Sequence, residues 1–215
     1  MSPRVHHVVR RSRRRSALEL PHVDPIAPVR RSDPFDDPDW LFEPKYDGFR
    51  GLAYLTREGC TLRSRRDIEF DRFDELRLIL REQLDVRDAI LDGEVVALDR
   101  NGRPSFRDLM RRTSTVAFAV FDVLWLDGRD LRGLPLERRK QFLDVAVPAN
   151  TAHVMKVLTI DRDGVALFKA TEKLDLEGIV AKRKVDPYDR TTTWYKVLNP
   201  SYSQKEGRAE LFRRG

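Results

Sequence analysis

The 215-residue sequence contains little cysteine and histidine and no long apolar run. Cys60 is its only cysteine, so no disulfide can form within the chain, which is typical of a reducing compartment. No run approaches the ~20 apolar residues of a membrane span, and the N-terminus lacks the apolar core of a secretion signal. We therefore expect a cytoplasmic protein, nucleoid-associated if the source is bacterial, with no membrane partner.

Two further absences exclude function classes. The four histidines have no Cys or His neighbours at metal-ligand spacing, which argues against a zinc site. No glycine-rich phosphate loop is present, so a P-loop nucleotide triphosphatase is excluded. What remains, with 40% hydrophobic and 35% charged residues, is a length and composition suited to one globular domain with a polar surface.

The positive charge is concentrated at the N-terminus. Residues 1–15 contain six arginines and no acid, and without those six the 41 basic residues fall to 35, matching the 35 acidic ones. Such an arm can bind phosphates by releasing counterions. A solvated tail without a fixed role and an arginine-rich mitochondrial transit peptide are the alternatives.

Prolines and composition divide the chain. Pro21, Pro25 and Pro28 interrupt any helix near the N-terminus. We expect a basic, disordered tail over residues 1–32, one folded domain over 33–200, and a C-terminal tail over 201–215.

Within the domain, short apolar runs alternate with helical periodicity. Expected strands cover 41–45, 51–55, 60–64, 89–98, 116–128, 153–158, 178–182 and 194–198. Expected helices cover 70–84, 105–110, 136–147 and 163–174, with the third on the surface and Val165, Phe168 and Leu174 of the fourth facing inward. Many strands with interspersed helices predict an α+β fold with two antiparallel sheets around a cleft.

The sequence LFEPKYDGFR, residues 41–50, carries the most specific chemistry. An apolar strand would lead into a turn made by Asp47 and Gly48, which tolerate unusual backbone angles. That turn would present Lys45 at the mouth of a pocket. A lysine held among cations and apolar walls can lose its proton and act as a nucleophile. The alternative is an exposed lysine beside a tight turn.

Five further segments follow this lysine in a fixed order. They read SRRD (64–67), LDGEVV (91–96), FDVLWLDG (121–128), EGIVAKR (177–183) and WYKVLNP (194–200). Each segment is weak evidence alone, but six segments in order make a chance resemblance improbable. Together they resemble the motifs of covalent nucleotidyltransferases, which are ATP-dependent DNA ligases, RNA ligases and capping enzymes. The resemblance is greatest to the ligase module of bacterial end-joining ligases.

The resemblance implies an enzyme with ATP and Mg²⁺ or Mn²⁺ as cofactors and with the ligase-like nucleotidyltransferase fold. Residues 33–200 would then be its adenylation (nucleotidyltransferase) domain. Lys45 would form a lysyl-AMP and pass the AMP to a 5′-phosphate at a nick, which the 3′-hydroxyl then joins. Nicked or broken duplex DNA, with end-binding or other repair proteins, would be the partners. An RNA ligase or capping enzyme, and a non-catalytic module that binds DNA ends or nucleotides, stay open as alternatives.

The resemblance also implies roles for basic residues. Lys182 and Lys196 would point at the α-phosphate, where fixed cations stabilise transition-state charge. Arg50 and Arg65 would hold ribose and phosphate oxygens, or the 5′-phosphate of the nick. Any one of the lysines could instead be a surface residue with a snorkelling stem.

Acidic and aromatic residues complete the implied site. Glu177 would bind the metal, because carboxylates suit Mg²⁺. Glu94 would contact the ribose or the metal, and Glu43 would lie at the edge of the base. Phe121 would stack on the purine, although without the resemblance a core aromatic in an apolar strand is the better expectation.

Three departures from the family pattern stand out. Ser64–Asp67 reads Ser-Arg-Arg-Asp where relatives carry Ser-Arg-Asn-Gly at a turn that favours positive φ. Leu198 replaces the second lysine of the closing motif. Residues 201–215 are too few for the oligonucleotide-binding barrel that follows in relatives. We therefore expect efficient reaction from free ATP to be weakened.

Overall fold

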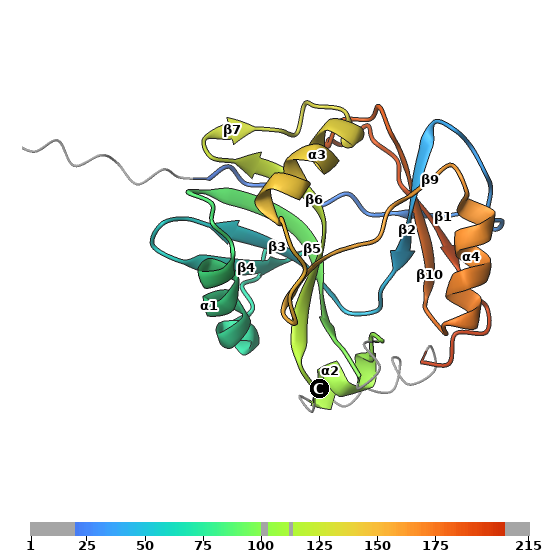
Figure 1. Cartoon of the computed structure of the whole chain (residues 1–215), viewed down its shortest axis with the longest axis horizontal. Helices are drawn as coiled ribbons and strands as arrows, with labels where there is room; N and C mark the ends of the chain where they lie inside the picture. Colours follow the sequence, from blue (N-terminus) through green and yellow to red (C-terminus); the bar gives the residue numbers. More distant parts are fainter. Residues whose placement is uncertain (1–19, 100–102, 112–113, 205–215) are drawn as a thin grey trace, which may run out of the picture.

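The computed structural model describes residues 20–99, 103–111 and 114–204, which form two sheets with helices on their outer faces (Figure 1). The first sheet has the strand order β1–β11–β10–β2–β9. In that order its strands span Val29–Arg30, Tyr195–Leu198, Gly178–Arg183, Trp40–Lys45 and Ile160–Asp161.

The second sheet has the strand order β4–β3–β5–β6–β7, with β8 also paired to β6. Its strands are β4 (Cys60–Ser64), β3 (Phe49–Leu55), β5 (Ala89–Ala97), β6 (Val116–Leu126), β7 (Arg129–Asp130) and β8 (Val154–Lys156). The turn at 46–48 joins β2 of the first sheet directly to β3 of the second, so the nucleophile candidate Lys45 lies where the two sheets meet.

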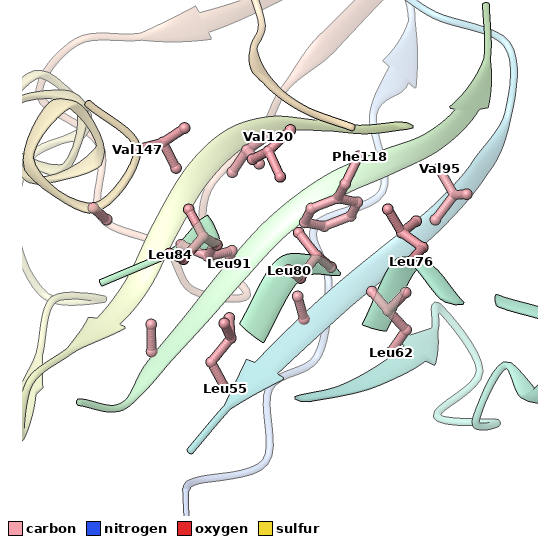
Figure 2. Packing of buried hydrophobic residues seen from close by; sticks show 14 of the residues in the cluster. Leu55, Leu62, Leu76, Leu80, Leu84, Leu91, Val95, Phe118, Val120 and Val147 are labelled. Carbon is pink, nitrogen blue, oxygen red and sulfur yellow. The ribbon is translucent and has the colours of Figure 1, made fainter. Parts of the chain in front are cut away.

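The helices cover the sheets according to their apolar faces. They are α1 (Asp74–Gln83), preceded by a 3-10 turn (Asp71–Phe73), then α2 (Phe106–Arg111), α3 (Leu136–Ala146) and α4 (Gly164–Lys173). Leu76 and Leu80, one helical turn apart on α1, pack with Leu62 and Phe118 of the second sheet in the largest core cluster (Figure 2). Among the described residues, no helix is long and apolar enough to cross a membrane.

Strand alternation separates core from cavity in the first sheet. Phe42, Ile179 and Val197 face α4 and are buried there with Leu167 and Phe168. Neighbouring positions on the same strands point to the opposite face, because side chains alternate along a strand. The register pairs Glu43 with Val180 and Val180 with Lys196, and it places all three on the cavity side.

The α+β fold with two sheets is confirmed, but two of its pairings differ from the expectation of purely antiparallel sheets. The β1–β11 and β6–β8 pairs are parallel, while the remaining ladders are antiparallel. Both β1 and β8 reach their partners through long connections rather than hairpins, and only hairpins force antiparallel pairing.

The expected tail boundaries are wrong for the described residues at both ends. Val23 and Ile26 are buried against the second sheet, and Val29–Arg30 forms β1 on the first sheet, so the strap from residue 20 to residue 30 links the two sheets. Tyr202 is buried as well. The proline-rich segment packs as extended chain, which proline permits, although it forms no helix. The arginine arm at 1–15 lies outside the described residues.

The expectations about helix faces are confirmed only in part. Helix α3 lies on the surface, but its inner face includes the fully buried Arg139. On α4, Phe168 faces inward as expected, whereas Leu174 is 47% exposed. The helix ends at Lys173, so Leu174 no longer follows the helical periodicity that predicted its orientation.

Candidate active site

A cavity of about 430 Å³ lies between the two sheets, a size suited to a nucleotide. Strands β2, β10 and β11 supply one wall and β3, β5 and β6 the other. All residues that the sequence indicated for the site line it: Glu43, Lys45, Arg50, Arg65, Glu94, Phe121, Glu177, Lys182 and Lys196. The structure therefore brings the whole set together, while the role of each residue stays a prediction.

Lys45 ends β2 and faces Glu177, which precedes β10. Lys45 Nζ donates a hydrogen bond to Glu177 Oε2 at 2.5 Å, and both side chains are largely buried. Gly178 makes this placement possible, since its φ is +140° and a Cβ there would lie 2.0 Å from the carbonyl oxygen of Val197. The pair therefore depends on a glycine that lets β10 begin close against β11.

Gly48 has a different role from the one expected. It does not have positive φ. Instead, a Cβ at Gly48 would lie 2.2 Å from the carbonyl oxygen of Val95 on β5. The turn after Lys45 thus packs directly on the backbone of the second sheet.

We expect Gly48→Ala to displace this turn and to destabilise the fold by about 1–3 kcal/mol, because the clash is with backbone rather than with a flexible side chain. Thermal unfolding measures the loss. Gly59→Ala is the matched control, since a Cβ at Gly59 meets nothing within 4 Å. Equal unfolding temperatures for the two variants would show that the turn is not tightly packed.

Glu43 holds two lysines at the base of the cavity. Lys140 of α3 donates to Glu43 Oε1, and Lys182 Nζ lies 2.6 Å from Glu43 Oε2. Burial acts to raise the pKa of Glu43, but the two lysines outweigh burial and the pKa lies below its ordinary value. Glu43 is therefore an ionised acceptor inside the cavity wall.

Lys182 differs from a cation aimed freely at a phosphate. It is 1% exposed, and its Nζ lies 4.1 Å and 4.2 Å from the ring centroids of Phe121 and Trp194. Burial lowers the pKa of Lys182 to about 8, against the opposing effect of Glu43. The expected α-phosphate role for Lys182 thus competes with an ion pair and cation–π contacts already in place.

Arg50 is likewise engaged within the protein. Its guanidinium binds both carboxylate oxygens of Asp92, at 2.6 and 2.7 Å, and lies over the ring of Phe121. The Tyr188 hydroxyl donates a hydrogen bond to the same carboxylate and accepts one from the backbone N–H of Ile26. Burial opposes the charge, yet Asp92 holds the pKa of Arg50 above its usual value. This network fixes the strap against the cavity wall.

Glu94 is the second carboxylate near Lys45. Burial raises the pKa of Glu94 to about 7, while Lys45 and Arg50 act in the opposite direction. No cluster of three or more Cys, His, Asp or Glu side chains that could hold a metal occurs in the described part of the chain. Two carboxylates, Glu94 and Glu177, still fit Mg²⁺, which commonly takes one or two carboxylates together with substrate phosphates and water.

The SRRD turn adopts the positive φ that a glycine usually provides. Asp67 adopts φ +60°, which aspartate tolerates better than most residues, and its carboxylate pairs with Arg63 at 2.6 Å. Arg65 and Arg66 line the cavity rim and are exposed. No ion pair within the described residues involves either arginine, so both can bind an anion.

Lys196 and Leu198 lie on the same face of β11, because they are two residues apart on one strand. Lys196 lines the cavity and, like the two rim arginines, takes part in no ion pair among the residues that the structure covers. Leu198 pairs with Gly178 in the ladder, next to Glu177. A lysine at 198 would therefore lie on the same side of β11 as Lys196.

The sequence did not indicate Lys140, Asp92 or Trp194 as site residues. The sequence could have indicated Asp92, because it lies two residues before Glu94 on one strand and therefore shares its face. Lys140 had none, because it belongs to a basic stretch on an amphipathic helix and reaches Glu43 only through the tertiary fold.

Comparisons with known proteins agree with this geometry. The family model described as ATP dependent DNA ligase domain matches residues 30–197. The multifunctional non-homologous end joining DNA repair protein LigD of Mycobacterium tuberculosis is 37% identical over 164 residues, which is 73% of this chain and 21% of that protein. The SPbeta prophage-derived DNA ligase-like protein LigB of Bacillus subtilis is 30% identical, with 85% of this chain and 69% of that protein covered.

Solved structures of ligase D resemble this chain as well. A mycobacterial DNA ligase D complexed with ATP and MES superposes with a TM-score of 0.71 at 29% identity, covering 81% of this chain and 59% of that chain. The ligase domain of M. tuberculosis LigD gives a TM-score of 0.67 at 30% identity, covering 80% and 58%. The chain spans about a fifth of the length of the LigD relatives it matches. With the family match extending over most of its length, the chain belongs to the ATP-dependent DNA ligase domain family.

Proposed function

We propose that this chain is the adenylation domain of an end-joining DNA ligase that transfers AMP from ATP to Lys45 and then to a DNA 5′-phosphate. The observation that carries the proposal is the placement of Lys45 Nζ beside Glu177 in a nucleotide-sized cavity. The proposed nucleophile, the ring of Phe121 and the rim cations Lys196, Arg65 and Arg66 all line this cavity, and none of these cations has an ion pair within the described residues.

The first step forms one bond and breaks one bond. The Lys45 nitrogen bonds to the α-phosphorus, the bond from that phosphorus to the bridging oxygen breaks, and pyrophosphate leaves. The amine must lose its proton before it attacks, and Glu177 Oε2 lies within hydrogen-bond reach of it. Charge grows on the phosphate oxygens during attack, so Lys196, Arg65 and Arg66 are the best-placed stabilisers.

We propose Glu94 and Glu177 as the ligands of Mg²⁺ or Mn²⁺. A divalent ion supplies charge neutralisation to the phosphate oxygens when bound. We propose that Glu43, held ionised by Lys140 and Lys182, lies at the edge of the base and accepts a hydrogen bond from its exocyclic amine. We further propose nicked or broken duplex DNA as the substrate that receives the AMP, and the cytoplasm as the place of action.

Incubation with ATP labelled on the α-phosphate tests the proposal. The protein should carry the label through a denaturing gel, and the labelled protein should pass its AMP to nicked duplex DNA. A protein that takes no label under any divalent metal would refute the proposal. Competition with unlabelled GTP tests the base preference.

Leu198→Lys is expected to raise the rate of lysyl-AMP formation, because it adds a cation on the cavity side of β11 beside Lys196. Each 1.36 kcal/mol of added transition-state stabilisation is about tenfold in rate. Single-turnover labelling measures the change. Leu78→Lys, on the exposed face of α1, adds the same charge elsewhere and should change nothing. An unaltered rate for Leu198→Lys would mean that a side chain at position 198 does not contact the phosphates of ATP.

A further inference from the structure

The chain immediately after β11, residues 199–204, forms a clamp around the adenylation site. It contacts three separate parts of the fold within six residues. These are the turn that carries Glu177, the turn that follows Lys45, and the start of α2 below the second sheet. Sequence alone had assigned most of this segment to a tail.

Asn199 fixes the turn that presents Glu177. Its backbone N–H donates to the carbonyl oxygen of Glu177 at 2.9 Å, and its side-chain Nδ2 donates to the carbonyl oxygen of Leu176 at 3.1 Å. Its Oδ1 accepts the backbone N–H of Ser201 at 2.9 Å. Asn199 is 3% exposed, so both halves of its amide are used inside the protein. A carboxylate or an aliphatic side chain could not make both bonds.

Tyr202 fixes the turn that follows Lys45. Its hydroxyl donates to Asp47 Oδ2 at 3.3 Å, and both side chains are buried. Burial, with Asp47 and Glu177 as negative neighbours, raises the pKa of Tyr202, so the hydroxyl stays protonated and donates. Asp47 lies two residues after the nucleophile candidate, so this bond restrains the backbone that aims the Lys45 side chain.

The outer end of the clamp is anchored on both sides. Ser203 donates its backbone N–H to Asp175 Oδ1 at 2.9 Å. Gln204 Oε1 accepts the backbone N–H of Phe106 at 2.9 Å, at the start of α2. The clamp therefore joins the Glu177 side of the first sheet to the second sheet beneath the Lys45 turn.

We propose that Asn199 and Tyr202 are positioning residues for AMP transfer to Lys45. They hold the two turns at the spacing that places the Lys45 amine and the Glu177 carboxylate together in the cavity. Neither residue lines the cavity, so they act on the geometry of attack and not on nucleotide binding. This inference rests on the adenylation activity proposed above.

Single-turnover labelling at a series of ATP concentrations tests the inference on Tyr202→Phe and Asn199→Asp. The first variant removes only a hydroxyl, and the second keeps an acceptor for Ser201 but faces the Leu176 carbonyl with an oxygen. Hydrogen bonds of this kind predict a rate constant at saturating ATP lower by roughly ten- to hundredfold. The ATP concentration that gives half the maximal rate should change less than about threefold, since ATP binding itself is not altered.

Tyr195→Phe is the matched control, because Tyr195 lies on the opposite face of β11 from Lys196 and packs on Trp40. It should label at the wild-type rate. A role in folding alone would lower the labelled amplitude and leave the rate constant of the reacting fraction unchanged, and that result would overturn the proposal. Unchanged rate constants in both clamp variants would also overturn it. A wild-type protein that takes no label would instead refute the adenylation activity itself.

Discussion

We expect Lys45→Ala to abolish the attachment of AMP to the protein, because the variant lacks the amine proposed to bond to the α-phosphorus. The labelled band should disappear from the denaturing gel at every ATP concentration. The fold should persist, since the Lys45 side chain lies at a strand end and its main partner is one carboxylate, Glu177. Joining of a nick that already carries AMP does not use the lysine amine and should survive.

Lys156→Ala is a suitable control for this variant. Lys156 also pairs with a single carboxylate, Asp144, but lies outside the cavity. It should take the label as the wild type does. Full labelling of Lys45→Ala would show that another residue is the nucleophile, whereas loss of both labelling and thermal stability would mean that Lys45 is needed for folding.

Arg139→Met is expected to cause the largest loss of stability. Arg139 and Asp122 are both fully buried, with Nε and Nη2 of the arginine bound to the two carboxylate oxygens at 2.9 and 3.0 Å. A further nitrogen, Nη1, donates to the carbonyl oxygens of Leu134 and Asp186. Removing the arginine leaves a buried carboxylate without its cation, which costs about 3–5 kcal/mol.

Chemical denaturation measures this difference as a lower midpoint. Arg138→Met, one residue earlier on α3, is the control, because Arg138 is exposed and its side chain bonds only Gln141 among the described residues. Its free energy of unfolding should change by less than about 0.5 kcal/mol. Similar midpoints for the two variants would mean that the buried pair contributes little beyond its hydrophobic surroundings.

The sequence was most informative where chemistry and strand alternation coincide. Glu43 and Lys45 lie two residues apart on β2, as do Lys196 and Leu198 on β11, so one expected strand placed each pair on one face. The register between strands then brought these faces together. Neither the register nor the pairing order could be read from the segments themselves, because both depend on long-range contacts.

Sequence patterns failed where packing overrides local composition. The proline-rich strap was predicted as a tail, yet Ile26 is buried and helps to fix Tyr188 and Arg50. Proline content excludes a helix but says nothing about whether an extended segment packs on a sheet. Lys140 was likewise invisible in a basic helix, since its contact with Glu43 exists only once α3 lies against β6.

Which cations are already paired with a carboxylate could also be learned only from the structure. The sequence predicts that Lys182 and Arg50 bind phosphate or ribose oxygens, and both residues line the cavity. The structure pairs Lys182 with Glu43, which Lys140 also contacts, and it pairs Arg50 with Asp92. A sequence motif specifies a residue type, but the charge left for a ligand depends on which neighbours the fold supplies.

The measurement that tests the central claim most directly is the location of the AMP adduct. The wild-type protein is incubated with ATP and Mg²⁺, its intact mass is recorded, and peptides produced at alkaline pH are fragmented, because a phosphoramidate bond hydrolyses in acid. The account predicts a mass increase of one adenylyl group and fragments that place it on Lys45. An adduct on a different lysine, such as Lys182 or Lys196, or no adduct at all, would contradict it.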